Sequence, residues 1–313
     1  MSGKASSTGE RSDSAAAFPP HVLREYALLA DGERGILVGP RGDYVWMCAP
    51  GWDSDPVFSA LIGGGGIYAV TPTDPRFVWG GYYENGTLIW HSRWVTSTGI
   101  IECREALTFP GDAHTAVILR RVIAVDGRAR VRVVLDPRAE FGKRPMTNVK
   151  HPGGRWTARS GRLYLRWSGA RPAKRVADGS LTLDLEVDPG AHHDLVFEVG
   201  EHGFTDPPPS AQGAWDATEA AWNREIPQLS DNLAPTDARH AYTVLRGLTT
   251  AGGGMVAAAT MCLPERARAG RNYDYRYAWI RDQCYTGQAI AAAHPSPLLD
   301  DAVAFIAGRI LAD

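Results

Sequence analysis

The sequence predicts a chain of more than one domain, in which an antiparallel β-sandwich precedes a smaller helical region. Residues 22–203 contain repeated β-branched runs in which apolar and polar residues alternate, with glycine, proline and aspartate between the runs. Pro207-Pro208-Pro209 marks a change of composition, and apolar residues recur at helical spacing after it. Alternation with a period of two is typical of strands with one buried face, and many short strands separated by turn residues favour a sandwich. We therefore expect β structure first and α structure second.

The clearest strand signal lies in residues 129–135, where apolar residues at every second position alternate with Arg130 and Arg132. The β-branched run 116–125 precedes it. Asp126-Gly127 between the two runs predicts a β-hairpin, although Arg128 could lengthen the turn. The same alternation recurs at 163–167 and 181–187.

The first helix is expected over residues 211–224, because Trp215 and Trp222 lie two turns apart on one face. Pro227 should end it.

Thr236 or Asp237 can cap the next helix. An apolar stripe is expected along that helix, and three glycines at 252–254 stop it. The stripe consists of Ala241, Leu245 and Leu248.

Two further helices follow. Residues 282–293 form a strong helical pattern, which Pro295-Ser296-Pro297 breaks. Asp300 or Asp301 should begin the last helix, which carries apolar residues at helical spacing. These residues are Val303, Ile306, Ala307 and Ile310.

Together these signals divide the 313-residue chain into four parts. The first stretch is rich in serine, glycine and alanine and lacks the continuous apolar core of a secretory signal, so we expect it to be disordered. The predicted parts are a disordered tail (1–20), a β-sandwich domain (21–206), a helical linker (207–233) and a helical domain (234–313).

Composition narrows the classes of function. A formal net charge of −2 favours neither nucleic acid nor an anionic membrane as a partner, and no apolar run approaches the length of a membrane span. The four cysteines are scattered without a Cys-x-x-Cys pair, which predicts reduced thiols in a cytoplasmic protein and no metal or cofactor. They are Cys48, Cys103, Cys262 and Cys284.

Two features of the β region have competing interpretations. His192-His193-Asp194 could belong to a metal site, but a polar turn before a strand at 195–199 is favoured because no other histidine or cysteine stands at ligand spacing. A group of aromatic residues could form a carbohydrate-binding platform, although core and cross-strand pairs are favoured in a β domain. This group is Trp79, Tyr82, Tyr83, Trp90 and Trp94.

The strongest chemical signal lies in residues 271–282, hereafter the signature segment. It combines aromatic rings, guanidinium groups and carboxylates just before an apolar helix. Sugar rings stack on tyrosine or tryptophan, and their neighbouring hydroxyls match the paired donors of arginine and the paired acceptors of aspartate. The competing interpretation is an ordinary helix N-terminus, with Asp282 or an earlier aspartate as its cap.

The signature segment, with Leu263-Pro264-Glu265 before it, resembles the motif that opens the catalytic barrel of glycoside hydrolase family 15. That family contains glucoamylases, glucodextranases and a group of bacterial and archaeal trehalases. The resemblance extends from about residue 22 to the end of the chain. Earlier stretches similar to the family's N-terminal domain are 25–32, 42–50, 58–62 and 135–142.

The resemblance implies a large β-sandwich followed by the first helices of an (α/α)6 barrel, which is incomplete in this chain. It implies that Tyr275 stacks on a sugar ring, that Trp279 walls the subsite for terminal glucose, and that Arg281 with Asp282 forms hydrogen bonds to that glucose. Family members hydrolyse α-glucosidic bonds with inversion, using a carboxylic acid and a carboxylate roughly 6.5–9.5 Å apart. In the family both are glutamates on later barrel helices, so the catalytic residues stay unknown and Glu265 is expected to be structural.

Two hypotheses follow from the sequence. The first is an exo-acting glycoside hydrolase whose substrate is an α-glucoside such as maltose, trehalose or a dextrin end. The second is a non-catalytic carbohydrate-binding or assembly module, or one half of a split enzyme. An open barrel would expose apolar stripes on its helices, which need a partner chain or self-association to complete the barrel.

Overall fold

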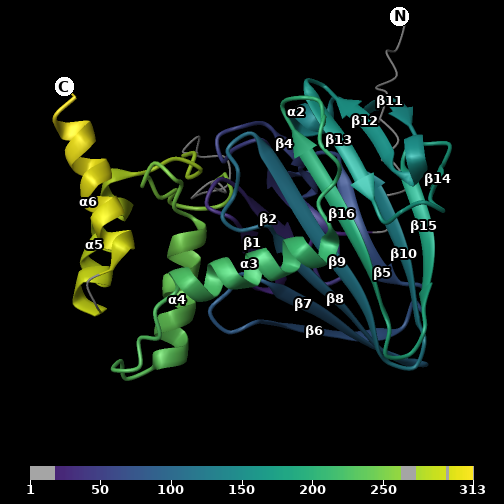
Figure 1. The fold of residues 1–313 in the computed structure, drawn as a ribbon, viewed down its shortest axis with the longest axis horizontal. Helices are drawn as coiled ribbons and strands as arrows, with labels where there is room; N and C mark the ends of the chain where they lie inside the picture. Colours follow the sequence, from purple (N-terminus) through teal and green to yellow (C-terminus); the bar gives the residue numbers. More distant parts are fainter. Residues whose placement is uncertain (1–17, 262–272, 294–295, 313) are drawn as a thin grey trace, which may run out of the picture.

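The computed structural model describes residues 18–261, 273–293 and 296–312. A β-rich region with antiparallel sheets comes first and a few helices follow, as the sequence predicts (Figure 1). Most of the predicted disordered tail lies outside the described residues. So do Leu263-Pro264-Glu265 and the first two residues of the signature segment, Arg271 and Asn272.

Three antiparallel sheets build the β region. In order across each sheet, the first contains β1 (Ala27–Ala30), β2 (Gly35–Val38), β3 (Tyr44–Cys48) and β4 (Pro56–Phe58). The second contains β14 (Lys174–Arg175), β15 (Leu181–Val187), β10 (Ala129–Asp136) and β5 (Ile67–Pro72). The third contains β11 (Met146–Lys150), β12 (Trp156–Ser160), β13 (Leu163–Ser168), β16 (His192–Gly200), β9 (Thr115–Asp126), β8 (Gly99–Leu107), β7 (Trp90–Thr96) and β6 (Phe77–Tyr83). Short helical turns are η1 (Leu23–Glu25), η2 (Ala60–Ile62), α2 (Ala139–Gly142) and η3 (Pro152–Gly154).

One apolar core joins the three sheets. Tyr68 of β5 lies at its centre, with its ring edge-on to Trp167 and Phe197 of the third sheet at centroid distances of 6.1 and 5.6 Å. Tyr44 of the first sheet contacts Tyr68 in the same way at 5.4 Å. Edge-to-face aromatic pairs at this spacing are favourable beyond their buried area, so the rings fix how the sheets face one another.

The predicted hairpin of residues 116–135 is wrong. β9 pairs with β8 and β16, whereas β10 pairs with β5 and β15, so the two strands belong to different sheets. The chain does turn at Gly127, which adopts a φ of +67° and lies so close to the carbonyl of Thr98 that a Cβ would stand 2.3 Å from it. A turn signal reports only that the chain reverses. Here both strands bury their apolar faces in the core between the sheets.

The aromatic group of the third sheet is mainly structural. Trp94 is fully buried and pairs across strands with Trp79, while Tyr83 pairs with Trp90, and this confirms the favoured interpretation. Tyr82 differs, because it is 46% exposed and stacks on the ring of His91.

The prediction of a polar turn at His192-His193-Asp194 is wrong, since the three residues form the first part of strand β16. Asp194 accepts hydrogen bonds there from Arg121 and from the indole of Trp215. Its carboxylate therefore links the third sheet to the helix that carries Trp215.

Helix α3 (Ala211–Glu225) lies across the third sheet (Figure 1). Trp215 and Trp222 are both fully buried, as their spacing predicts. Trp222 stacks on Phe109 with a centroid distance of 3.6 Å, and the guanidinium of Arg104 lies 4.3 Å from the ring of Trp215. The segment predicted as a linker therefore carries a helix that is packed onto the β region.

Helices α4 (Pro235–Gly247) and α6 (Pro297–Ile310) both begin with a proline. Ala234 and Ser296 occupy the N-cap positions, and neither makes a capping hydrogen bond through its side chain. Proline suits the first helical position because its fixed φ is preorganised and its missing N–H has no helical partner there. The predicted caps Thr236 and Asp237 are therefore wrong, and so is the predicted start of the last helix at Asp300 or Asp301. All four residues lie inside the helices.

The apolar stripe predicted for α4 is only partly correct. Leu245 and Leu248 are half-buried, but Ala241 is exposed. Tyr242 and Thr243 are buried instead. The helix therefore buries a neighbouring face, in which these side chains bury more area than alanine would.

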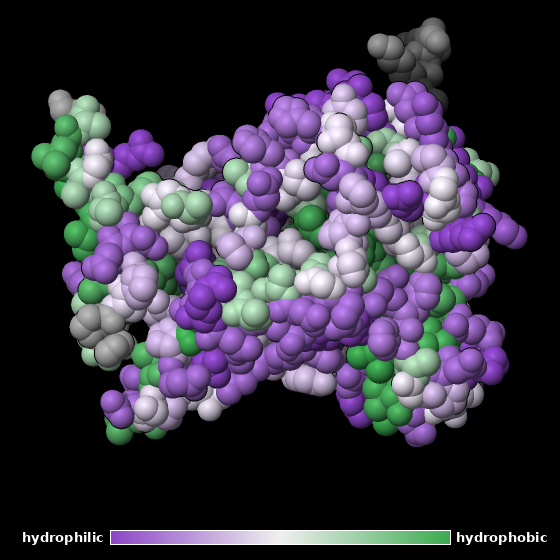
Figure 2. Space-filling view, in the orientation of Figure 1, coloured by the Kyte–Doolittle hydropathy of each residue, from purple (hydrophilic) through white to green (hydrophobic). Residues whose placement is uncertain are grey.

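Helices α5 (Ile280–Ala293) and α6 pack against each other at the end of the molecule opposite β11 and β14 (Figure 1). Leu298 and Ala302 are buried in this contact region. Val303 and Ile310 occupy helical spacing but are 59% and 67% exposed, and Figure 2 shows apolar residues gathered on the surface of these helices. In the described part of the chain, this apolar face has no covering element. No described helix is long and apolar enough to cross a membrane.

A fully buried ion pair lies in the core of the β region. Arg120 of β9 approaches Glu105 of β8 at 3.1 Å and also donates to the carbonyls of Tyr68 and Gly42. Its guanidinium lies 4.3 and 4.7 Å from the rings of Tyr44 and Tyr68. Burial raises the pKa of Glu105, and the positive charge of Arg120 opposes that rise. A single arginine therefore connects all three sheets.

We expect Arg120→Met to lower the free energy of unfolding by about 3–5 kcal/mol, because it leaves the Glu105 carboxylate buried without its cation. Urea unfolding followed by tryptophan fluorescence measures the change. Arg132→Met is the matched control, since the Arg132–Asp184 pair lies on the surface and should contribute at most about 1 kcal/mol. Equal losses in the two variants would contradict a central role for Arg120.

Candidate functional site

The described part of the signature segment runs beside residues 255–259 and leads into α5. The amides of Ala257 and Ala258 donate to the carbonyls of Tyr277 and Tyr275, at 3.0 and 2.8 Å. The indole of Trp46 in β3 donates to the carbonyl of Ala259 at 2.9 Å. Backbone pairing and one buried tryptophan therefore tie the segment to the first sheet.

Arg276 anchors the signature segment to the β region. Its side chain is buried and donates to the Asp274 carboxylate through Nε and Nη2, with the shorter contact at 2.7 Å. Nη1 donates to the carbonyl of Ser54 at 2.7 Å and lies 3.3 Å from Sγ of Cys48. One guanidinium thus joins the segment before α5 to the loop that follows β3.

The protonation states of this anchor follow from its contacts. Burial alone would raise the pKa of Asp274, but hydrogen bonds and the positive charge of Arg276 hold it below its usual range. The same contacts raise the pKa of Arg276 against the effect of burial. Burial raises the pKa of the Cys48 thiol to about 11, and Arg276 offsets this only in part. At neutral pH the anchor is a carboxylate, a guanidinium and a neutral thiol.

The structure brings the aromatic residues of the signature segment together. The rings of Tyr275 and Tyr273 pack edge-on against Trp279, at centroid distances of 5.3 and 5.8 Å. The indole of Trp279 donates to the carbonyl of Asp274 at 3.0 Å, so the anchor also fixes the tryptophan. Tyr275 and Trp279 are half-buried and Tyr273 is 43% exposed. Such a cluster presents partly accessible aromatic surface.

Arg281 and Asp282 lie at the start of α5 and pair with each other. The Asp282 carboxylate accepts from Nε of Arg281 at 3.1 Å and approaches Nη2 at 2.9 Å. This attraction raises the pKa of Arg281, whose guanidinium lies 5.7 Å from the ring of Trp279. Tyr275, Trp279, Arg281 and Asp282 therefore form one continuous group. The pair can offer a donor and an acceptor side by side to a ligand with neighbouring hydroxyls.

Two positioning features were not assigned from the sequence. Asp274 and Arg276 are charged residues of the signature segment, but their spacing does not reveal which carbonyls accept hydrogen bonds from the guanidinium of Arg276. Gln283 is almost fully buried, accepts from the amide of Met255 at 2.9 Å and donates to the carbonyl of Gly253 at 3.1 Å. It orients α5 from the turn after α4.

Within the described ranges, no group of three histidine, cysteine, aspartate or glutamate side chains is arranged to hold a metal ion. The site as described is therefore built from aromatic rings, one arginine–aspartate pair and a buried anchor.

Two protein families match this chain. Residues 16–206 match the family described as trehalase-like, N-terminal, and residues 239–312 match glycosyl hydrolases family 15. The first match alone covers more than half of the chain.

Two mycobacterial trehalases are similar to this chain and support the same family. A trehalase of Mycobacterium tuberculosis is 28% identical over 93% of this chain and 46% of its own length. A trehalase of Mycolicibacterium smegmatis is 26% identical over 93% of this chain and 47% of its own length. The chain therefore spans about half the length of the relatives it matches.

Among solved structures, a bacterial glucoamylase in complex with acarbose has a similar fold. It matches 90% of this chain and 50% of its own with a TM-score of 0.56, at 11% sequence identity. This likeness concerns the fold alone.

We expect Asp274→Asn to loosen the signature segment at pH 7, because a neutral amide attracts Arg276 less than a carboxylate. The folded-state pKa of Asp274 lies below its usual value, so its stabilising effect is present above pH 3.8 and is lost as the pH falls through the folded pKa. Hydrogen exchange of the amides in 273–279 should be faster in the variant at pH 7, and the difference should shrink as the pH falls through the lowered pKa of Asp274, below 3.8.

Asp237→Asn is the control for this experiment, because Asp237 is exposed on α4. It should leave exchange in 273–279 unchanged. Protection that is the same in Asp274→Asn and the unmodified protein at pH 7 would argue against the anchor.

Proposed function

Because the chain belongs to the trehalase-like group of glycoside hydrolase family 15, we propose that it is part of a hydrolase acting on a terminal α-glucose. The observation that carries this proposal is the cluster of aromatic rings with Arg281 and Asp282, held in place by the buried Arg276. The activity concerns the whole enzyme, of which this chain corresponds to about half by comparison with its relatives.

In this proposal the four predicted residues make different contacts with one glucose. Tyr275 and Trp279 supply apolar faces for the C–H surface of the ring, and Arg281 with Asp282 forms hydrogen bonds to its hydroxyls. The mutual ion pair of Arg281 and Asp282 orients both side chains before the sugar binds. Preorganisation of this kind reduces the entropy lost on binding.

We further propose that hydrolysis proceeds with inversion and that the acid and base lie outside the residues described here. An inverting acid must be protonated at working pH, which requires a raised pKa and access to substrate. The pKa of Asp274 is lowered rather than raised, so this residue does not suit the role of the acid. Asp282 is paired with Arg281. Burial raises the pKa of Asp31 to about 6, but that residue is only 2% exposed and is held by the amides of residues 33 and 34.

Other described carboxyl groups with a raised pKa are equally inaccessible. Asp43, Glu105 and Asp136 are each at most 5% exposed, and burial is the main cause of each shift. A buried carboxyl group inside the β region cannot meet a glycosidic oxygen. This supports the placement of the catalytic pair elsewhere in the enzyme.

The order of elements supports a division into domains that remains a proposal. The β region would be the sandwich domain (21–206), α3 with its flanks the linker (207–233), and α4 to α6 the opening helices of an (α/α)6 barrel (234–313). The mutual packing of α5 and α6 fits neighbouring helices of such a barrel.

Trehalose is the substrate we favour, because the two mycobacterial relatives are both named trehalase. Maltose and dextrin ends present the same terminal α-glucose and remain the alternatives. The residues described here would hold the terminal glucose, and this unit is common to all three substrates.

A second candidate function follows from the exposed apolar face of α5 and α6. Val303, Ile310 and Leu311 are 59%, 67% and 84% exposed, which is typical of a surface that another element covers. The chain would then be a non-catalytic carbohydrate-binding or assembly module, or half of a split enzyme. Sedimentation and thermal unfolding of the purified chain test this second function. A monodisperse monomer that unfolds cooperatively would argue against it.

We expect Arg281→Ala to weaken trehalose binding about tenfold, because it removes charged hydrogen bonds to the sugar and frees Asp282 from its partner. Calorimetric titration of this chain with trehalose and with maltose measures the effect. Arg309→Ala is the matched control, since Arg309 lies on exposed α6 over Phe305 and outside the signature segment. Equal affinities in Arg281→Ala and the unmodified chain would refute the proposed role.

Glucose release from trehalose, maltose and dextrin tests the placement of the catalytic pair. This chain alone should release none, because the acid and base lie elsewhere. Release that disappears in Arg281→Ala would mean that a usable pair lies within these residues, and our placement would be wrong.

A further inference from the structure

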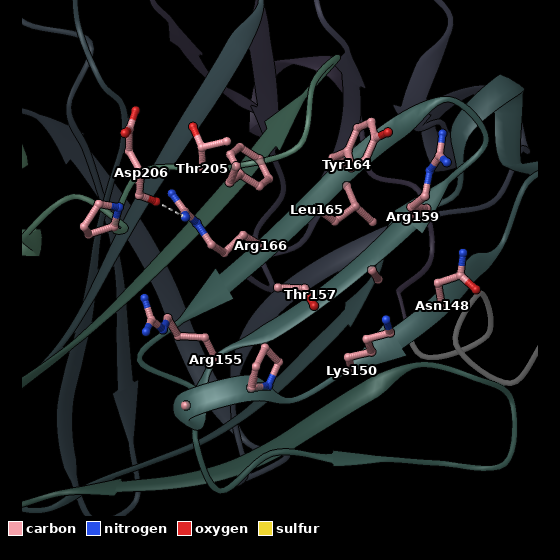
Figure 3. Close-up of a pocket in the computed structure, with 15 residues that line it drawn as sticks. Asn148, Lys150, Arg155, Thr157, Arg159, Tyr164, Leu165, Arg166, Thr205 and Asp206 are labelled. Atoms are coloured by element: carbon pink, nitrogen blue, oxygen red, sulfur yellow. Dashed lines mark hydrogen bonds between the residues drawn. The ribbon is translucent and has the colours of Figure 1, made fainter.

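A hollow of about 820 Å³ lies on the outer face of the third sheet, over β11, β12 and β13 (Figure 3). Its volume falls within the usual range for small-ligand sites. It is remote in sequence from the signature segment, and none of the residues assigned to glucose binding lines it. The polar side chains of its lining that carry the inference are Lys150, Arg155, Thr157, Arg159, Tyr164 and Arg166.

The strand register explains why cations gather there. Lys150 faces Thr157, which in turn faces Arg166, so these three side chains form one row across β11, β12 and β13. Arg159 faces Tyr164 in the next row. Arg155 immediately precedes β12 and lines the same hollow as Arg159. Figure 3 shows the basic side chains spread around Thr157 rather than meeting at one point.

The hollow is lined by four cationic side chains, and these differ in whether a carboxylate pairs with them. They are Lys150, Arg155, Arg159 and Arg166. Arg166 is held by both oxygens of Glu198, at 2.6 and 2.7 Å, and by the carbonyl of Asp206. In the described part of the chain, Lys150, Arg155 and Arg159 form no ion pair with a carboxylate. Arg159 instead lies over the ring of Tyr164, 4.5 Å from its centre.

We propose that this hollow binds an oligosaccharide that carries several anionic substituents, such as phosphate, sulfate or carboxylate groups. Arginine and lysine bind such oxygens strongly, and their wide spacing here suits an extended ligand rather than one small anion. Thr157, Asn148 and Thr205 add groups that match sugar hydroxyls. The site is distinct from the proposed glucose subsite and would attach the enzyme to an acidic glycan.

The preference for a sugar rests on the proposed function, whereas the preference for an anion rests on the charges of the hollow. The net charge of −2 gives the chain no general attraction for polyanions. Any attraction for a polyanion must therefore come from the local charges of the hollow. A nucleic acid and an acidic peptide also carry anionic groups, so the experiment compares both with the sugar.

The test measures binding of a dextran sulfate hexasaccharide to this chain by calorimetry at moderate ionic strength. Neutral isomaltohexaose, inorganic sulfate, an oligothymidylate and a polyglutamate peptide are compared with it. We expect the sulfated sugar to bind most tightly. The double variant Lys150→Gln/Arg159→Gln should lose about tenfold or more in affinity, because two charged contacts are removed.

The matched control is Arg24→Gln/Arg76→Gln, which removes the same charge from exposed positions outside the hollow. It should bind like the unmodified chain, and all proteins should show the same unfolding midpoint. Unchanged affinity in the hollow variant, equal affinity for the neutral sugar, or tighter binding of the oligothymidylate or the peptide would overturn the proposal. Arg281→Ala should bind the sulfated sugar normally, so this test and the test of the glucose subsite fail independently.

Discussion

The buried guanidinium of Arg276 is the contact on which the arrangement of the site depends. It takes its acceptors from two places far apart in the chain, the Asp274 carboxylate and the backbone around Ser54. A buried cation that loses its partners costs several kcal/mol, so the loop after β3 and the segment before α5 are coupled. Trp279 depends on the same anchor through its bond to the carbonyl of Asp274. The β region is therefore part of the support of the candidate sugar site.

Buried or partly buried charge pairs recur through the β region and give it definite geometry. Arg120 with Glu105 connects the sheets, and Arg166 with Glu198 joins β13 to β16. Such pairs contribute less to net stability than apolar packing of equal volume would, but each permits only one arrangement of its donors and acceptors. Where a cation of this region lacks a carboxylate, as Arg159 does, the charge remains available to a ligand.

The candidate site was predictable in kind but not in geometry. Residue types in the signature segment predicted aromatic faces beside an arginine and an aspartate, and the structure gathers Tyr275, Trp279, Arg281 and Asp282 into one group. The role of Arg276 could not be read from the segment, because besides Asp274 it donates to a backbone carbonyl more than 200 residues away. Every residue carries a backbone carbonyl, so the sequence does not show which of them will accept a side-chain hydrogen bond.

The sequence by itself determined many of the strands and helices and the order of the two regions. Alternation with a period of two produced strands such as β10 and β15, and helical spacing produced α3 with its two buried tryptophans. Tertiary structure alone decided which strands pair, since β9 and β10 enter different sheets despite a strong turn between them. It also decided which face of α4 is buried. The physical reason is that a local pattern specifies which side of an element is apolar, whereas its partner is selected by the total area and polar contacts buried across the whole chain.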